Sequence, residues 1–241
     1  MEVSMVQQKK KSKIPFLMKT MKAKYVEDTM KKGRFCFNHP SVFNKWESND
    51  SAQFDRWDGF SSIIARDIMY FPIIDENENG IIYDKGKKLS NKALFHMQSG
   101  LAKHTPICCF RIIEDEEVSI DYEAKTFSYS LGENADRIIK EFGHDSYIII
   151  KTVPFLKRLS NHYGIYKGAV TYKDVIRIGE ICTDEQHQEL VEQLFRKDKR
   201  FEWQKEYRIA LTPPTEKNPV FVEIGSIEDI AFSGRIADLR N

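Results

Sequence analysis

The stretch Arg196-Lys-Asp-Lys-Arg-Phe-Glu-Trp-Gln-Lys-Glu-Tyr-Arg208, which runs directly into the apolar Ile209-Ala-Leu211, is the most informative part of this 241-residue chain. It combines basic charge, the aromatic side chains Phe201 and Trp203, and a carboxylate–guanidinium pair at the start of a predicted strand. Strand alternation places Glu206 and Arg208 on one face of that strand and Tyr207 on the other. The sequence therefore predicts a charged pair on a rigid element.

This pair supports two interpretations. A strand-borne glutamate suits a site where a ribose hydroxyl or a developing oxocarbenium ion needs a fixed negative partner, which makes Glu206 a candidate catalytic residue. Arg208 and Trp203 are then candidate substrate-binding residues. The alternative is a structural strand face, on which alternating Glu and Arg side chains oppose aggregation. The pattern favours neither interpretation over the other.

Two further groups contain candidate ligand-binding residues. Arg56 lies two residues before Asp58, so the two side chains do not share a helix face, but a turn would let them hold a ligand jointly. His162, Tyr163 and Tyr166 offer acid–base and stacking groups near a predicted helix end. For both groups the structural alternative is favoured, because charged side chains near helix ends commonly interact with the helix dipole.

Hydrophobic periodicity and turn residues predict an α+β fold. The predicted strands are Arg34–Phe37, Ile73–Ile74, Ile81–Tyr83, Ile107–Phe110, Ser146–Ile150, Ala169–Tyr172, Glu206–Leu211 and Val220–Ile224. The predicted helices cover Lys19–Lys32, Phe54–Tyr70, Pro154–His162 and a segment from Thr183 to Phe195. We expect a disordered basic tail over residues 1–17, followed by one compact domain over residues 18–241 with a mixed or antiparallel sheet and flanking helices.

Composition restricts the classes of function. The net charge is +1, so binding to nucleic acid or to an acidic protein requires a local basic patch, and Lys9–Lys13 and Arg196–Arg208 are the candidates. No apolar stretch is long enough for a membrane span, and Ile14–Met18 is too short for a signal-peptide core, so we expect a cytoplasmic protein without a membrane partner. The oligomeric state is not predicted.

Cysteine spacing gives no reason to expect a metal or a disulfide. The cysteines are Cys36, Cys108, Cys109 and Cys182, and none forms a CxxC pair. The chain also lacks the phosphate-binding loop, GxGxxG, GxSxG and HExxH motifs of common nucleotide, hydrolase and metalloprotease sites. Asp55, Asp58 and Glu114-Asp115 provide carboxylates for a magnesium-dependent nuclease, although acid-rich segments are more often solvated turns.

Several short blocks together resemble a widespread group of uncharacterised bacterial and phage proteins. The opening from Lys24 to Asn44 is similar to that group's helix, "gxfyfs" strand and "ps.FND" pattern, although Lys45-Trp46 stands where Asp-Pro is commoner. Pro106–Phe110 and the segment from His162 to Tyr172 fit its middle blocks, and Phe201–Ile209 is similar to its "f..q.EyRi" close. The similarity is spread over about 200 residues, a length typical of one domain.

The layout of these blocks also resembles ADP-ribosyltransferases, particularly the DNA-modifying toxins. This resemblance implies NAD as cofactor, Glu206 as the catalytic carboxylate and Tyr163 or Tyr166 as a residue that stacks on a ring. His39, Arg34 and Arg56 are alternatives for the early NAD-binding residue. The leading functional hypothesis is a phage or mobile-element protein that acts in host–phage conflict by ADP-ribosyl transfer. The alternative is a non-enzymatic inhibitor or adaptor that binds a protein or a protein–nucleic-acid complex.

Overall fold

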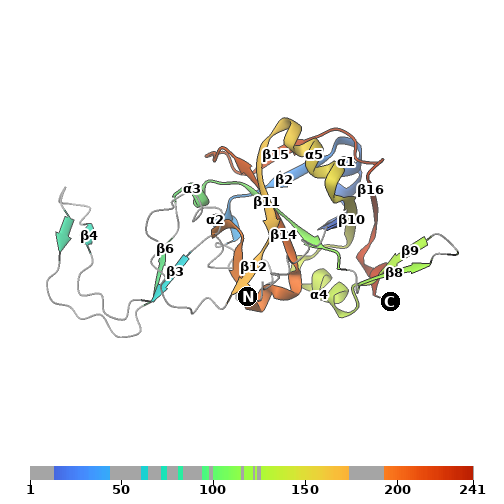
Figure 1. Ribbon diagram of the computed structural model, residues 1–241, viewed down its shortest axis with the longest axis horizontal. Coiled ribbons are helices and arrows are strands. Elements are labelled where there is room, and N and C mark those ends of the chain that lie inside the picture. Colours follow the sequence, from blue (N-terminus) through green and yellow to red (C-terminus); the bar gives the residue numbers. More distant parts are fainter. Residues whose placement is uncertain are drawn as a thin grey trace, which may run out of the picture. The chain divides into compact units, whose positions relative to one another are not determined.

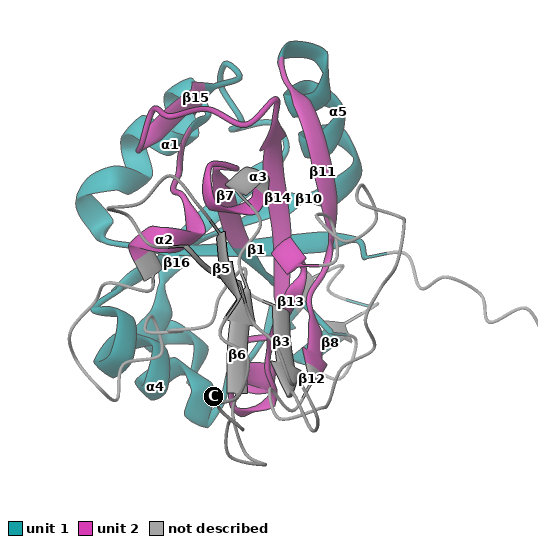
Figure 2. Cartoon of the chain, turned by 90° about the vertical axis from the view of Figure 1, so that its left-hand side faces the viewer, with its two compact units in different colours: residues 1–34, 110–162, 223–241 teal, residues 35–109, 163–222 magenta. Residues whose placement is uncertain are grey.

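A computed structural model describes residues 14–43, 61–64, 72–74, 81–83, 94–97, 100–114, 117–121, 123, 126–173 and 193–240. The described residues form helices and a largely antiparallel set of strands, so the predicted α+β fold class is confirmed (Figure 1). The chain divides into two compact units that interleave along the sequence (Figure 2). Unit 1 comprises residues 1–34, 110–162 and 223–241, and unit 2 comprises residues 35–109 and 163–222. The predicted tail segment Lys9–Lys13 lies outside the described residues.

The largest sheet has six strands in the order β11-β14-β7-β1-β10-β16. The boundary between the units falls within β7 (Ile107–Ile112). The remaining strands form two-stranded sheets. These are β12 with β13, β15 with β2, β3 with β6, β4 with β5, and β8 with β9.

Unit 1 is built around three strands of the large sheet. Its elements are β1 (Phe16–Met21), η1 (Ala23–Tyr25), α1 (Val26–Lys32), β8 (Val118–Asp121), β9 (Thr126–Tyr129), α4 (Glu133–Phe142), β10 (Ser146–Lys151), α5 (Thr152–His162), β16 (Ala231–Arg235) and η4 (Ile236–Leu239). The predicted strand Ser146–Ile150 and helix Pro154–His162 are confirmed within β10 and α5. The five residues Ser146–Ile150 are all buried, as expected for a strand with neighbours on both sides.

The start of unit 1 corrects the sequence prediction. Lys19–Lys32 is not one helix, because Lys19 to Met21 belong to β1 and the helix begins at Val26. Strand β1 pairs with β10 from Phe16 to Met21 and also with β7, and Leu17 and Met18 have no exposed surface. Pairing on both sides outweighs the local helical pattern. The strand also begins inside the range predicted as tail.

Unit 2 contains the predicted charged strand. Its elements are α2 (Pro40–Phe43), β3 (Ser61–Ile64), β4 (Pro72–Ile74), β5 (Ile81–Tyr83), β6 (Leu94–Met97), α3 (Gly100–Lys103), β11 (Gly164–Ala169), β12 (Thr171–Lys173), β13 (Arg196–Asp198), η3 (Lys199–Gln204) and β14 (Glu206–Thr212). Two further strands, β2 (Arg34–Phe37) and β15 (Val220–Glu223), each have one end residue in unit 1.

Several local predictions in unit 2 are confirmed and others are wrong. The hairpin over Pro72–Ile74 and Ile81–Tyr83 and the strand Arg34–Phe37 are confirmed. The predicted helix over Phe54–Tyr70 is wrong at Ser61–Ile64, which forms a strand paired with Leu94–Met97, and its other residues lie outside the described part. Cross-strand pairing explains this difference, because short apolar runs fit either structure until a partner strand is present.

The segment Gly164–Lys173 also differs from its prediction. Gly164 starts β11, where it pairs with Thr212 of β14. The predicted strand over Ala169–Tyr172 is divided, since Ala169 ends β11 and Thr171 begins β12. The described part of the chain contains no helix long and apolar enough to span a membrane.

Candidate functional site

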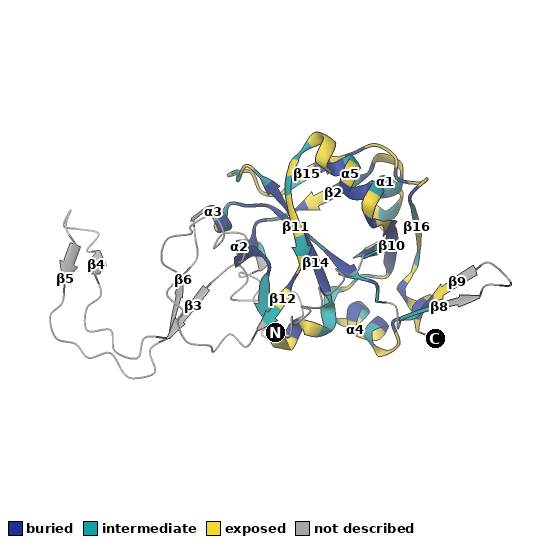
Figure 3. Ribbon diagram, in the orientation of Figure 1, coloured by how far each residue is buried: buried dark blue, intermediate teal, exposed yellow. Residues whose placement is uncertain are grey.

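Glu206 and Arg208 lie together on one face of β14, as strand alternation predicts. The antiparallel register places Arg208 opposite Gly168 and Ala210 opposite Tyr166. Directly opposed residues of paired strands project to the same side of the sheet, so Tyr166 shares this face with the charged pair. Six of the seven residues of β14 are buried, and Thr212 is partly exposed (Figure 3). The charged pair is therefore inside the protein rather than on a solvated strand face.

Two cations hold the Glu206 carboxylate. Arg208 Nε donates to Glu206 Oε1 at 2.6 Å, and Lys197 Nζ donates to Glu206 Oε2 at 2.9 Å. Lys197 Nζ also donates to Gln204 Oε1 at 2.8 Å. The exposed fraction is 4 % for Glu206 and 0 % for Arg208. Both carboxylate oxygens are thus engaged by buried charged donors. We call Glu206, Arg208 and Lys197 the Glu206 network.

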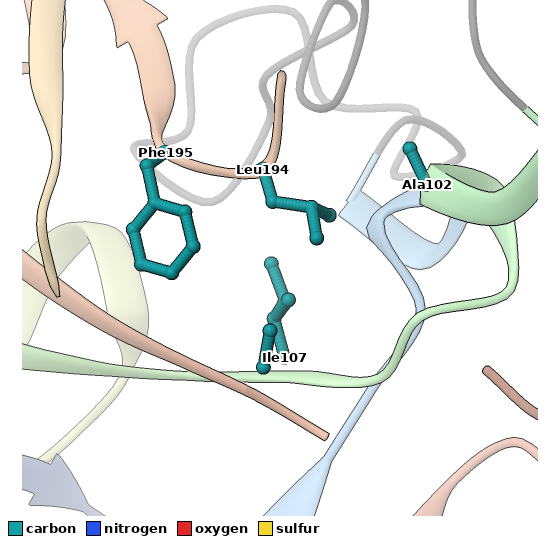
Figure 4. Close-up of a cluster of buried hydrophobic side chains, with 5 residues drawn as sticks. Ala102, Ile107, Leu194 and Phe195 are labelled. Atoms are coloured by element: carbon teal, nitrogen blue, oxygen red, sulfur yellow. The ribbon is translucent and has the colours of Figure 1, made fainter. Parts of the chain in front are cut away.

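Arg208 connects this network to the apolar core of unit 2. Its Nη1 donates to the backbone oxygen of Leu194 at 2.8 Å. Leu194 packs with Ala102, Ile107, Phe195 and Ala210 in one buried cluster, and Figure 4 shows the Leu194 side chain among its neighbours. Leu194 has no exposed surface, and Phe195 is also buried. One guanidinium therefore fixes the segment before β13 to the middle of β14.

The electrostatics of the network favour a permanently ionised glutamate. Burial alone raises the pKa of the Glu206 carboxyl, but the charges of Arg208 and Lys197, with hydrogen bonds from Arg208 and the Cys109 thiol, outweigh burial and hold that pKa well below its usual range. The backbone N–H of Glu206 donates to the Tyr172 hydroxyl at 2.7 Å. Burial, followed by the Glu206 charge, raises the pKa of the Tyr172 hydroxyl above its usual range.

The basic run before β14 contains both buried and exposed cations. Asp198 accepts a hydrogen bond from the backbone N–H of Arg200 at 2.9 Å and thereby caps η3. The Phe201 ring is buried, with Lys197 Nζ 4.9 Å and the Arg200 guanidinium carbon 4.6 Å from its centroid. Lys199 and Arg200 are exposed. The predicted basic patch is therefore divided between an internal network and a surface.

The other predicted site residues are distributed as follows. Tyr166 is exposed, and Tyr163 and Trp203 are half-buried, all in unit 2. His162 is exposed at the end of α5 in unit 1. Arg56 lies outside the described residues. Among the early candidates, Arg34 of unit 1 forms an ion pair with Asp28 at 3.4 Å, and His39 of unit 2 is buried.

Three members of the site were not predicted as such, namely Lys197, Tyr172 and Cys109. Lys197 was visible only as part of a basic run, and its separation of nine positions from Glu206 matches no periodic rule. Adjacent cysteines on a strand face opposite sides, and here Cys108 is buried while Cys109 is half-buried and contacts Glu206. No spacing in the sequence indicates that Cys109 rather than Cys108 faces the network.

Metal coordination finds no support among the described residues, where no group of three or more His, Cys, Asp or Glu side chains is arranged to hold an ion. Of the carboxylates considered for magnesium, Glu114 is described, and Asp55, Asp58 and Asp115 are outside the described part.

The chain matches no protein-family model, no curated protein and no solved structure. The family resemblance and the activity that it implies therefore stay predictions.

Proposed function

We propose that this chain is a non-enzymatic inhibitor or adaptor that binds the acidic surface of a partner protein or protein–nucleic-acid complex. The observation that supports this proposal is the division of the basic run. Arg208 and Lys197 are used inside the protein to hold Glu206, whereas Lys199 and Arg200 are exposed on η3. Host–phage conflict is the biological setting that the sequence resemblance implies.

The two exposed cations are presented by an ordered segment. Asp198 caps η3, and the Arg200 guanidinium lies over the buried Phe201 ring. A charge held in place before association loses less conformational entropy on binding than a charge on an unrestrained side chain. Charges at the edge of an interface accelerate association and determine which partner is accepted, so this surface suits recognition of an acidic partner.

The test is quantitative co-purification of the tagged chain from its native host cells. We expect a stoichiometric partner with the wild type and, for the Lys199→Glu/Arg200→Glu double variant, an affinity at least about tenfold weaker because like charges then face each other. Lys157→Glu is the matched control, since Lys157 is an exposed lysine on α5 of unit 1. Nuclease treatment separates a protein partner from a complex that contains nucleic acid.

The result that contradicts this proposal is a chain that purifies without a stoichiometric partner, or a partner retained equally by the wild type and the double variant. Affinity should also fall as salt is raised, because the exposed charges are screened within about 10 Å at 0.1 M salt. An affinity that does not depend on salt would assign the contact to another surface.

NAD-dependent ADP-ribosyl transfer is the second candidate, and one observation favours it. The register of β11 and β14 places Tyr166, Arg208 and Glu206 on a single sheet face. Glu206 and Tyr166 are the carboxylate and a stacking ring that the resemblance implies, and Arg208 is the cation considered for substrate binding. In that reaction the carboxylate would stabilise the developing positive charge of the ribose ring. Lys197 would first have to leave Glu206 Oε2, where it now donates.

Titration calorimetry with NAD separates the two candidates. Transferase function predicts heat of binding at millimolar NAD or below, and weaker binding in Tyr166→Ala, since the exposed Tyr166 ring on this face is available for stacking. Tyr166 carries little of the core, so this variant tests binding without unfolding the chain. Absence of NAD binding in the wild type would reject the transferase.

A further inference from the structure

A second polar cluster in unit 2, distinct from the Glu206 network, surrounds the connection between β14 and β15. The backbone N–H of His39 donates to Asn218 Oδ1 at 3.0 Å, and the backbone N–H of Thr215 donates to the backbone oxygen of His104 at 2.9 Å. The loop Thr215–Asn218 is thus attached at one end to His104, which follows α3, and at the other to His39, which precedes α2.

The two imidazole rings meet edge to face, with ring centroids 5.7 Å apart. His39 is 5 % exposed, and its Nε2 is buried with no hydrogen-bond partner among the described residues. The His104 ring lies beside Glu216, with 3.2 Å between Nδ1 and Oε2. The His104 ring therefore contacts the same loop that the backbone hydrogen bonds attach.

We propose that His39 and His104 form a pH-sensitive clamp that holds the Thr215–Asn218 loop when His39 is neutral and releases it when His39 is protonated. A proton on Nε2 would create a donor with no acceptor in a buried position, and would place a charge beside a second imidazole. Opening of the loop hydrates the ring and relieves both costs.

Among the residues that the structure describes, His104, Thr215 and Glu216 act on the His39 ring. Burial is the largest effect and lowers the pKa of His39, and His104 lowers it further, whereas the Thr215 backbone and the charge of Glu216 raise it. The pKa is lower in the closed loop than in the open one. The clamp is therefore fully stable above pH 6.5, the usual pKa of histidine, and weakens as pH falls through 6.5 towards the folded-state value.

Amide hydrogen exchange of Thr215 tests the clamp directly. The measured exchange rate is first corrected for the pH dependence of intrinsic exchange. The equilibrium constant for loop opening should then increase by up to about tenfold as pH is lowered from 7.5 to 5.5, because one proton is taken up on opening. His39→Gln removes the titrating group and should make the corrected protection independent of pH. His162→Gln, at an exposed histidine of unit 1, should behave as the wild type.

Two results would overturn the clamp: protection of Thr215 in the wild type that does not change over this range, or the same loss of protection in His39→Gln. If His39→Gln does not fold, the NMR titration of the His39 ring in the wild type decides the matter. A midpoint below 6.5 accompanied by shifts at Thr215 and Asn218 supports the clamp, and a midpoint at or above 6.5 contradicts it.

Discussion

At Glu206 one carboxylate is shared by two buried cations, one from the same strand and one from the preceding basic run. Removal of one partner from such an arrangement leaves an uncompensated buried charge, which is usually far more costly than loss of an exposed ion pair. We therefore expect Glu206 to act as part of the core. If the same Glu, Arg and Lys side chains formed an ion pair at the surface, removal of one of them would cost little stability.

His144 of unit 1 provides a residue-scale prediction. Burial, followed by the charges of Lys19 and Lys22, lowers the pKa of His144 from 6.5 to about 4, and its Nδ1 is 2.8 Å from Thr20 Oγ1. Because the folded-state pKa is depressed, the neutral ring contributes stability above pH 6.5 that is lost as pH falls from 6.5 to about 4.

We expect His144→Gln to lose less stability than the wild type between pH 7 and pH 4.5, by about 2 kcal/mol. Urea unfolding at the two pH values measures this difference, and the exposed His162 provides the control as His162→Gln. An identical pH dependence in His144→Gln and the wild type would show that the ring titrates normally.

At the scale of elements, the sequence predicted those features that are determined locally. The apolar run Ser146–Ile150 specifies a buried strand, and glycine stops α1 at the expected residue. Strand β16 was missed, because Ala231-Phe-Ser-Gly-Arg235 has no regular alternation and forms a strand by pairing with β10. For the site, alternation predicted that Glu206 and Arg208 share a face, but not that the face is buried under Leu194.

The glycines that end α1 and α4 give an element-scale prediction. Gly33 and Gly143 both have positive φ, 59° and 63°. A Cβ at Gly33 would lie 2.2 Å from the backbone oxygen of Gly225, whereas a Cβ at Gly143 would meet nothing within 4 Å.

Gly143→Ala should therefore cost about 1 kcal/mol for left-handed backbone strain alone. Gly33→Ala should cost about 1–3 kcal/mol more, because the backbone must also move. Thermal unfolding of the two variants side by side measures the difference. Equal destabilisation would mean that the close approach of Gly33 to Gly225 is not rigid.

Across the protein, charged side chains divide into those paired inside a unit and those exposed at the surface. In unit 2 the Glu206 network joins β13, β14 and the segment that carries Leu194, and the exposed cations of η3 are a short distance along the same chain. In unit 1 comparable buried pairing occurs where Arg111 contacts Glu117 and Tyr129. Each unit therefore contains an arginine buried in an ion pair with a glutamate.

The central claim is that Glu206 is a structural residue, and the free energy of unfolding of Glu206→Gln at pH 7 tests it most directly. The matched control is Glu202→Gln, an exposed glutamate on η3 in the same basic run. The account predicts a loss of about 3–5 kcal/mol for Glu206→Gln, since two cations are left buried without their carboxylate, and a change within about 0.5 kcal/mol for Glu202→Gln. If Glu206→Gln is as stable as the wild type, the carboxylate is not needed by the fold, and the account is wrong.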